Sequence, residues 1–263
     1  MTYADGRYGA LDIGTVTCRL LVADVEDGRI IDVDKEYAIT DLGVGVDATG
    51  RLSEAAIERV LACVDRYLEV LARYDTPEHP VRRLIAMATS ASRDAANGPE
   101  FAARLAERGI TLAVIPGSRE AQLTFLGASS DFPGENLLVV DIGGGSTELT
   151  RIDGGRDFDN ASMGQGSLSS FARYVRGILP TATESEAIAC RLRARLGALP
   201  DARAYRASVL YGIGGSVRAA AKMQAQAAGD IVRPKSMTAD EIRAILEWCH
   251  EDPDTFAHTA LKA

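Results

Sequence analysis

Residues 137–146 have the sequence Leu-Leu-Val-Val-Asp-Ile-Gly-Gly-Gly-Ser, and residues 8–17 have the similar sequence Tyr-Gly-Ala-Leu-Asp-Ile-Gly-Thr-Val-Thr, 129 positions earlier. After each copy a second apolar run leads to an Asp-Gly pair, at residues 27–28 and 153–154. This pattern predicts a buried strand, a glycine turn, a second strand and a hairpin. Two such hairpins predict two similar domains that face one another across a cleft.

The rest of the chain alternates between strand and helix patterns. A third strand is expected at residues 29–42, and Ser53 is a good N-cap for a long helix whose apolar residues share one face. Further strands are expected at residues 83–88, 111–115, 158–163 and 207–210. Further helices are expected from Ser90, at residues 99–108, 118–128, 167–175 and 183–196, after Ser216 to Met223, and over 238–263 with a break at Pro253. This order favours a mixed α/β fold, with domains at residues 1–127 and 128–263.

Composition excludes several classes of protein. The chain has 263 residues and a formal net charge of -8, so no general positive field draws it to nucleic acid or to an anionic membrane surface. No long apolar stretch is present and residues 1–6 are polar, so we expect neither a membrane span nor a signal peptide, and a cytoplasmic protein. Four scattered cysteines without a CxxC pair indicate reduced thiols, and the three histidines lie near no glycine-rich turn.

Three glycine-rich turns predict phosphate binding. Consecutive N–H groups on a tight turn without Cβ atoms can surround an oxyanion, and a helix N-terminus adds to the effect. The alternative is that these glycines serve the turns alone, but each turn follows a buried strand and two belong to the repeat. The groups expected at the phosphate are Gly14, Thr15, Thr17, Gly143, Gly144, Gly145, Ser146, Thr147, Gly214, Gly215 and Ser216.

Two aspartates end equivalent strands of the repeat, Asp12 and Asp141. They could cap their own turns through side-chain hydrogen bonds. They could also hold a phosphate-bound Mg²⁺, a hard cation that few carboxylates and several waters usually bind. Duplication favours the metal site, with Asp12 also at the substrate.

The same motifs resemble those of the exopolyphosphatase/guanosine pentaphosphate phosphatase (Ppx/GppA) family, a branch of the actin-like ATPase superfamily. The resemblance rests on residues 89–97, Thr-Ser-Ala-Ser-Arg-Asp-Ala-Ala-Asn, on residues 116–123, Pro-Gly-Ser-Arg-Glu-Ala-Gln-Leu, and on residues 141–148, Asp-Ile-Gly-Gly-Gly-Ser-Thr-Glu. Their order and spacing hold from Tyr8 to about Met223. The resemblance implies two actin-like (ribonuclease H-like) α/β domains with mixed sheets facing an interdomain cleft.

The resemblance also implies roles for single residues. Glu120 would be the catalytic glutamate that orients or deprotonates water, Arg93 a phosphate clamp, and Glu148 a group near the metal or the water. A carboxylate near a cleft can serve as a general base, and a guanidinium suits bidentate phosphate contact. From the residues alone, Glu120 could equally be a first-turn acid stabilised by its helix dipole, and Arg93 an exposed arginine.

The chain departs from the family pattern at three places. Val16 stands where the family usually has asparagine, Arg119 replaces the first of two paired glutamates, and the family's last helices are expected to be missing after Ala263. Val16 leaves only a backbone N–H at its position, and Arg119 adds a positive charge.

The predicted function is hydrolysis of terminal orthophosphate from inorganic polyphosphate or from guanosine pentaphosphate (pppGpp), assisted by Mg²⁺. The catalytic residues would be Glu120, Asp141 and Glu148, and the metal ligands Asp12, Asp141 and Glu148. Without a dense Lys/Arg track, we expect short polyphosphates to be favoured. The alternatives are a weakly catalytic phosphate or alarmone sensor of the same fold, or an actin-like small-molecule kinase. Alarmone preference and a homodimer are left open.

Overall fold

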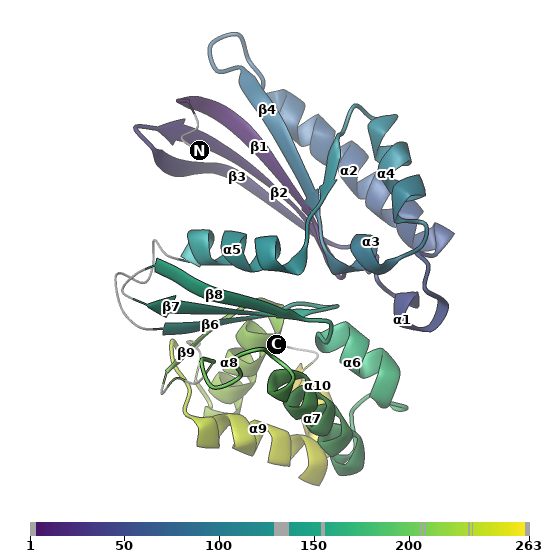
Figure 1. Ribbon diagram of the computed structural model, residues 1–263, viewed down its shortest axis with the longest axis vertical. Helices are drawn as coiled ribbons and strands as arrows, with labels where there is room; N and C mark the ends of the chain where they lie inside the picture. Colours follow the sequence, from purple (N-terminus) through teal and green to yellow (C-terminus); the bar gives the residue numbers. More distant parts are fainter. Residues whose placement is uncertain are drawn as a thin grey trace. The chain divides into compact units, whose positions relative to one another are not determined.

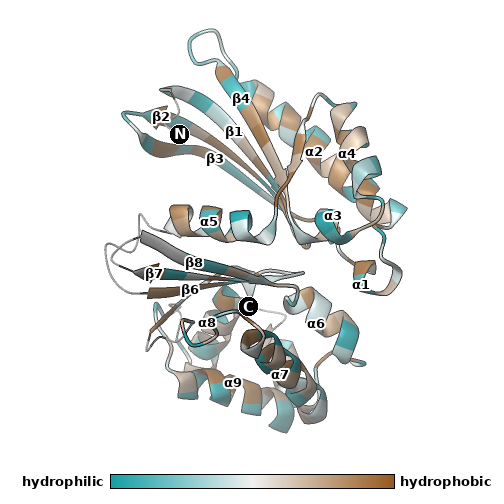
Figure 2. Ribbon diagram, viewed as in Figure 1, coloured by the Kyte–Doolittle hydropathy of each residue, from teal (hydrophilic) through white to brown (hydrophobic). Residues whose placement is uncertain are grey.

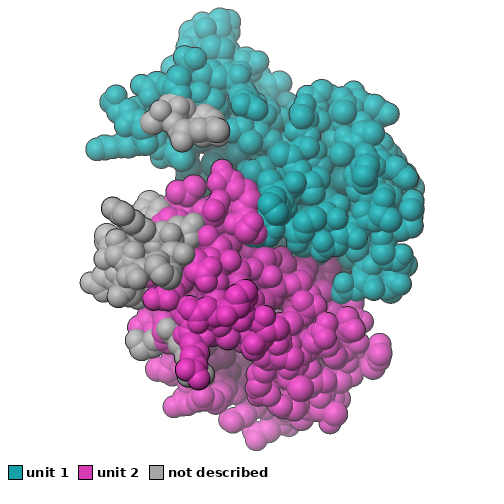
Figure 3. Space-filling model, viewed as in Figure 1, with its two compact units in different colours: residues 1–117 teal, residues 118–263 magenta. Residues whose placement is uncertain are grey.

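The computed structural model describes residues 4–128, 137–153, 156–205, 207, 209–230, 232 and 234–260. The chain divides into two compact units, Met1–Gly117 (unit 1) and Ser118–Ala263 (unit 2), which Figure 3 shows in two colours. Among the described residues, no helix is both long and apolar enough to cross a lipid bilayer.

Unit 1 contains a five-stranded mixed sheet in the order β3-β2-β1-β4-β5 (Figure 1). The strands are β1 (Gly6–Ile13), β2 (Thr17–Glu26), β3 (Arg29–Ile39), β4 (Val81–Ala88) and β5 (Leu112–Val114). The first three strands pair antiparallel, whereas β4 runs parallel to β1 and β5 runs parallel to β4. The glycine turn between β1 and β2 therefore lies at the same end of the sheet as the end of β4.

The helices of unit 1 are α1 (Val46–Thr49), α2 (Glu54–Tyr74), α3 (Ser90–Asp94) and α4 (Gly98–Ala106). The predicted cap of α2 is confirmed, because the Ser53 side chain accepts a hydrogen bond from the Ala56 amide. Apolar residues of α2 such as Val60 and Val64 are fully buried and pack with Leu11 and Val22 of the sheet. Figure 2 shows hydrophobic and hydrophilic segments alternating along α2, as expected for a helix with one buried face.

Unit 2 contains a four-stranded mixed sheet in the order β8-β7-β6-β9. Its strands are β6 (Leu137–Ile142), β7 (Thr147–Asp153), β8 (Arg156–Met163) and β9 (Leu210–Ile213). β6, β7 and β8 pair antiparallel in succession, and β9 runs parallel to β6. This topology repeats the first four strands of unit 1, and the predicted α/β fold of two similar domains with mixed sheets is confirmed.

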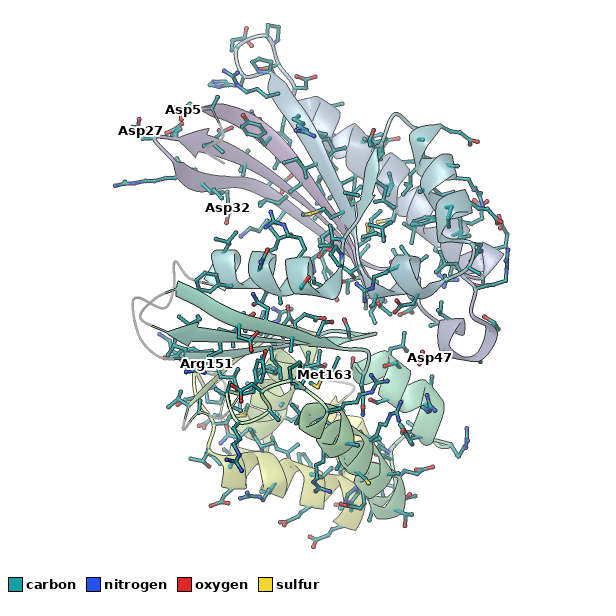
Figure 4. All side chains as sticks on the ribbon, viewed as in Figure 1. Asp5, Asp27, Asp32, Asp47, Arg151 and Met163 are labelled. Atoms are coloured by element: carbon teal, nitrogen blue, oxygen red, sulfur yellow. The ribbon has the colours of Figure 1, made fainter. Side chains whose placement is uncertain are left out.

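The helices of unit 2 are α5 (Gly117–Ala128), α6 (Ser167–Tyr174), α7 (Ala182–Gly197), α8 (Gly215–Ala228), α9 (Ala239–Glu251) and α10 (Pro253–Ala260). On one face of the sheet, the Thr150 hydroxyl donates to the Ala121 carbonyl of α5 at 3.2 Å. On the other face, Leu138, Leu149 and Met163, the last labelled in Figure 4, form a cluster with leucines of α7. The sheet of unit 2 is therefore covered on both faces.

The repeat predicted from the sequence is also a repeat of backbone geometry. The Gly14 amide donates to the Thr17 carbonyl at 2.9 Å, and the Gly143 amide donates to the Ser146 carbonyl at 3.0 Å. The same bond thus closes both turns. We call residues 14–17 loop 1 and residues 143–146 loop 2.

The first predicted Asp-Gly hairpin is confirmed. Asp27 has φ 50° and Gly28 has φ 75°, as a type I′ turn requires. The Asp27 amide donates to the Asp5 carboxylate at 3.1 Å, and both aspartates lie at this tip of the sheet in Figure 4. The second predicted hairpin includes Gly154, which lies outside the described residues.

Among the boundaries that differ from the sequence prediction, two have a clear cause in the structure. The last strand of unit 2 covers Leu210–Ile213 instead of residues 207–210, because β9 pairs with β6 from Leu210 opposite Leu138 to Ile213 opposite Asp141. The predicted domain boundary after residue 127 places α5 with the first domain. In the structure α5 belongs to unit 2, since it bonds the sheet of that unit through Ala121.

Candidate functional site

Loop 2 is held from behind by the start of α6. The Gly143 carbonyl accepts hydrogen bonds from the Ser167 amide at 2.9 Å and from the Ser167 hydroxyl at 3.2 Å. The Gly144 carbonyl accepts from the Ser169 amide at 3.0 Å, and the Gly145 carbonyl accepts from the Ser169 hydroxyl at 3.3 Å. Three consecutive carbonyl groups of loop 2 are therefore tied to one helix start.

This anchoring fixes the direction of the loop 2 amides. The C=O and N–H groups of a planar trans peptide point in opposite directions. Because the three carbonyls are bonded to α6, the N–H groups of residues 144–146 are turned away from that helix. Successive amides that point to one side form a concave site for an anion.

Loop 1 is held in the same manner by residues 40–43, which we call the backing segment. The Val16 carbonyl accepts from the amides of Thr40 at 2.8 Å and Asp41 at 2.9 Å, and the Thr15 carbonyl accepts from the Gly43 amide at 2.8 Å. The amides of the next residue in each peptide are therefore turned away from the backing segment. Both loops combine tied carbonyls with amides that point elsewhere.

Two predicted acids of unit 2 lie opposite one another, Asp141 on β6 and Glu148 on β7. Opposite residues of antiparallel strands share a face, with Cβ atoms about 4.5–5.5 Å apart. Glu148 is 2% exposed and accepts a hydrogen bond from the Ser162 hydroxyl at 2.8 Å. Asp141 accepts one from the Thr124 hydroxyl at 3.3 Å. Each carboxylate is thus oriented by a hydroxyl from a neighbouring element.

Glu120 lies in the first turn of α5, as predicted. Thr124, which bonds Asp141, follows four residues later and lies on the same side of the helix. One carboxylate oxygen of Glu120, Oε2, is buried. The structure therefore brings Glu120 and Asp141 to the same face of α5, within one unit.

The start of α8 also lies beside Asp141. A Cβ atom on Gly214 would lie 2.9 Å from the carboxylate oxygen Oδ1 of Asp141, and Gly214 has φ 97°, so only glycine suits this position. No side chain among the described residues caps α8. The N-terminus of this 14-residue helix favours a negative charge.

The corresponding position of unit 1 has a different charge. Arg19 lies opposite Asp12, where unit 2 has Glu148 opposite Asp141. The Arg19 guanidinium carbon is 5.7 Å from the centre of the Tyr37 ring, a distance suited to a cation–π contact. Unit 2 therefore presents two acids beside its loop, and unit 1 presents one acid and one cation.

Arg93 lies in the last turn of α3, and its side chain is 27% exposed. Its Nη1 donates to the Ile115 carbonyl at 3.1 Å, and its Nε donates to Asp94 at 3.3 Å. The guanidinium thus joins α3 to the segment before α5. Its predicted role as a phosphate clamp stays a prediction.

Thr15, predicted at the phosphate, has its hydroxyl in a buried contact. Its Oγ1 lies 2.8 Å from the Ser90 hydroxyl, and the two residues are 8% and 3% exposed. The structure therefore supports a role for this hydroxyl in fixing loop 1 against α3.

We expect Thr15→Val to lower the free energy of unfolding by about 1–3 kcal/mol, because the Ser90 hydroxyl is left buried without its partner. Thr15→Ser keeps the hydroxyl and should have a much smaller effect. Urea unfolding of the two variants and the parent measures the difference. An unchanged unfolding free energy for Thr15→Val, together with weaker substrate binding, would show that this hydroxyl binds the substrate instead.

The donor set of unit 2 fits Mg²⁺. Mg²⁺ is usually bound by one or two carboxylates, with waters and substrate phosphates as the other ligands. Asp141 and Glu148 supply two carboxylates on one face. No group of three or more metal-binding side chains occurs among the residues that the structure describes. The predicted role of Asp12, which belongs to unit 1, as a further metal ligand stays a prediction.

The cysteines are free thiols, as the sequence predicts. Burial raises the pKa of the Cys18 thiol well above its ordinary value, so this thiol stays protonated. His250 bonds the Ser185 hydroxyl at 2.9 Å and joins α9 to α7.

Comparison with known proteins tests the family resemblance that the sequence motifs predict. The model of the Ppx/GppA phosphatase family matches residues 21–252, which is most of the chain. The chain belongs to the Ppx/GppA phosphatase family. The resemblance predicted from the motifs is confirmed at this level.

Relatives of this Ppx/GppA-family chain include proteins described as exopolyphosphatases. Exopolyphosphatase 2 of Mycobacterium tuberculosis is 41% identical over 155 residues, which cover 54% of this chain and 47% of the relative. The chain thus spans about half the length of this curated relative. Among solved structures, an exopolyphosphatase-like protein is 31% identical with a TM-score of 0.75, covering 87% of this chain and 71% of that one. An exopolyphosphatase from Cytophaga hutchinsonii is 27% identical with a TM-score of 0.77, covering 86% and 72%.

The sequence did not indicate the groups that orient the site. Ser162 and Thr124, which bond the carboxylates, and Ser167 and Ser169, which bond loop 2, carry no motif that marks them. A cluster of serines after a Gly-Gln-Gly turn, at residues 164–170, was the available signal. These residues act through the loops and acids that the family motif does mark.

Proposed function

We propose that this chain hydrolyses the terminal phosphoanhydride bond of inorganic polyphosphate, with short chains favoured, or of guanosine pentaphosphate, and releases orthophosphate. The observation that carries the proposal is the anchoring of loop 2, whose three amides are directed away from α6 beside two carboxylates. Membership of a phosphatase family and the names of the relatives support the same chemistry.

Phosphoryl transfer depends mainly on positioning and on stabilising charge in the transition state. The amides of loop 2 would bind the oxygens of the terminal phosphoryl group, and the start of α8 would bind a neighbouring phosphate. Because their carbonyls are already bonded, the loop 2 amides need little rearrangement when charge develops, which is the condition for strong electrostatic stabilisation.

Glu120 would orient or deprotonate the attacking water. Its position in the first turn of α5, one turn before the Thr124 that bonds Asp141, supports this role. A carboxylate within hydrogen-bond reach of the attacking water can serve as a general base.

Asp141 and Glu148 would hold Mg²⁺ in this proposal. The bound cation would neutralise charge on the phosphate oxygens. Thr124 and Ser162 would keep the two carboxylates in place, because each donates a hydrogen bond to one of them.

The preference for short chains follows from charge. The net charge of -8 repels a long polyanion unless cations line its path. Two arginines of unit 1 are engaged in ion pairs, because Arg104 pairs with Glu54 and Glu58 and Arg108 pairs with Asp65. Arg82, Arg83 and Arg119 are exposed, so salt screens their attraction for a polyanion and affinity should fall as salt rises.

A phosphate-release assay without an acceptor or ADP tests the proposal. We expect release from tripolyphosphate and guanosine pentaphosphate in the presence of Mg²⁺, with lower kcat/KM for polyphosphate of hundreds of units. Release that requires an acceptor would indicate a kinase. Tight binding of these compounds without release would indicate a sensor, and either result would overturn the proposal.

A further inference from the structure

The two loops differ in how their supports are stabilised. The serines that bond loop 2 belong to α6, which has eight residues. A hydrogen bond from the Gly166 amide to the Ser169 hydroxyl, at 2.9 Å, stabilises the N-terminal end of this helix. The backing segment of loop 1 continues instead into α1, a helix of four residues without a side-chain cap. The backing segment therefore has less local structure to hold it.

The backing segment also contains an uncommon backbone conformation. Asp41 has φ 49°, in the left-handed region that costs energy for a residue with a Cβ atom. Such a conformation persists where surrounding interactions impose it. The Asp41 amide is one of the two donors to the Val16 carbonyl of loop 1, so the position of loop 1 depends on this residue staying where it is.

Leu42 of the backing segment is buried in the core, and Arg59 supplies a polar support beside it. Its Nε donates to the Thr40 carbonyl at 3.0 Å and its Nη2 donates to the Asp41 carbonyl at 3.4 Å. Arg59 lies on α2, the longest helix of unit 1, whose neighbouring residues Ile57 and Val60 are buried in the core. A rigid helix therefore reaches the backing segment through one guanidinium.

We propose that Arg59 is a positioning residue for loop 1. Its guanidinium holds the carbonyls of residues 40 and 41, and the Asp41 amide, which shares a peptide with the Thr40 carbonyl, holds the Val16 carbonyl. The bond to Val16 directs the amide of Thr17 toward the phosphate. The expected effect of Arg59 on turnover rests on the proposed function, whereas its expected effect on the backing segment does not. A planar guanidinium can bridge two carbonyls, which a lysine ammonium does less well.

The test compares the parent with Arg59→Ala, Arg59→Lys and the control Arg66→Ala. Arg66 is an exposed arginine about two turns further along α2. With tripolyphosphate we expect Arg59→Ala to lower kcat by about 10- to 100-fold, as a small misplacement of binding groups can. Arg59→Lys should recover only part of this loss, and Arg66→Ala should behave like the parent.

Two further readouts separate positioning from a general loss of stability. Guanidinium chloride, at concentrations far below those that unfold proteins, should restore part of the activity of Arg59→Ala, whereas equal sodium chloride should not. Hydrogen exchange should accelerate at the amides of Thr40 and Asp41 in Arg59→Ala, while exchange in β1 stays unchanged.

Each outcome bears on one claim. If the parent releases no phosphate, the proposed function fails, and hydrogen exchange still tests the role of Arg59. Unchanged exchange at Thr40 and Asp41, or unchanged kcat in an active protein, would overturn the proposal. A lower melting temperature with parental kcat would also overturn it, because Arg59 would then act on stability alone.

Discussion

Glu120→Gln should lower the turnover of tripolyphosphate by about 10² to 10⁴, the usual contribution of a positioned general base. The amide has nearly the shape of the carboxylate but cannot accept a proton from water. Binding of the substrate should change little, because the loop 2 amides are held by α6 and not by Glu120. Initial rates over a range of substrate concentrations separate kcat from KM.

The matched control is Glu100→Gln, which replaces the first-turn acid of α4. Both substitutions remove a negative charge from a helix start, an effect worth about 0.3–1 kcal/mol of stability. If Glu120 were only a first-turn acid, the two variants would show the same small loss of stability and parental turnover. That result would remove Glu120 from the mechanism.

Gly166→Ala should abolish most activity by displacing loop 2. A Cβ atom at this position would lie 2.5 Å from the Gly143 carbonyl oxygen and 2.6 Å from the carbonyl carbon and oxygen of Gly144. The backbone of Gly166 is extended, with φ -120°, so alanine adds no backbone strain and the collision acts alone. We expect a loss of about 10² or more in kcat, comparable with removal of an oxyanion donor, and a lower melting temperature.

Gly127→Ala is the control for Gly166→Ala. Gly127 lies in α5 with nothing within 4 Å of an added Cβ atom. Alanine in a helix is favoured over glycine by about 0.5–1 kcal/mol, so this variant should be slightly more stable and as active as the parent. Parental activity in Gly166→Ala would show that loop 2 tolerates movement, against the importance we give to its anchoring.

The sequence was sufficient for the parts of the fold that rest on local patterns. The repeat around Asp12 and Asp141 predicted the glycine turns of both loops, and Ser53 predicted the start of α2. The apolar run that includes residues 207–213 did not reveal where β9 begins, because pairing with β6 determines that limit. A strand in a sheet is placed by its partner as much as by its own residues.

In the candidate site, too, the sequence indicated the local motifs but not the long-range contacts. The loops and the three acids lie in motifs, and their roles stay predictions. The bonds that orient them join distant residues, such as Arg59 with Thr40 and Thr15 with Ser90. A single serine or arginine gives no local sign of such a bond, because the tertiary fold brings the partners together. For this reason the sequence predicted Thr15 at the phosphate but did not reveal the contact of its hydroxyl with Ser90 of α3.

The central claim is that water attacks the terminal phosphorus of a phosphoanhydride chain. It is tested most directly by incubating the protein with tripolyphosphate and Mg²⁺ in ¹⁸O-enriched water and analysing the first products by ³¹P NMR. The oxygen of water would bond to the terminal phosphorus, and the bridging oxygen would leave with the pyrophosphate. We predict ¹⁸O in orthophosphate and none in pyrophosphate. Label in pyrophosphate, or no orthophosphate at all, would contradict the account.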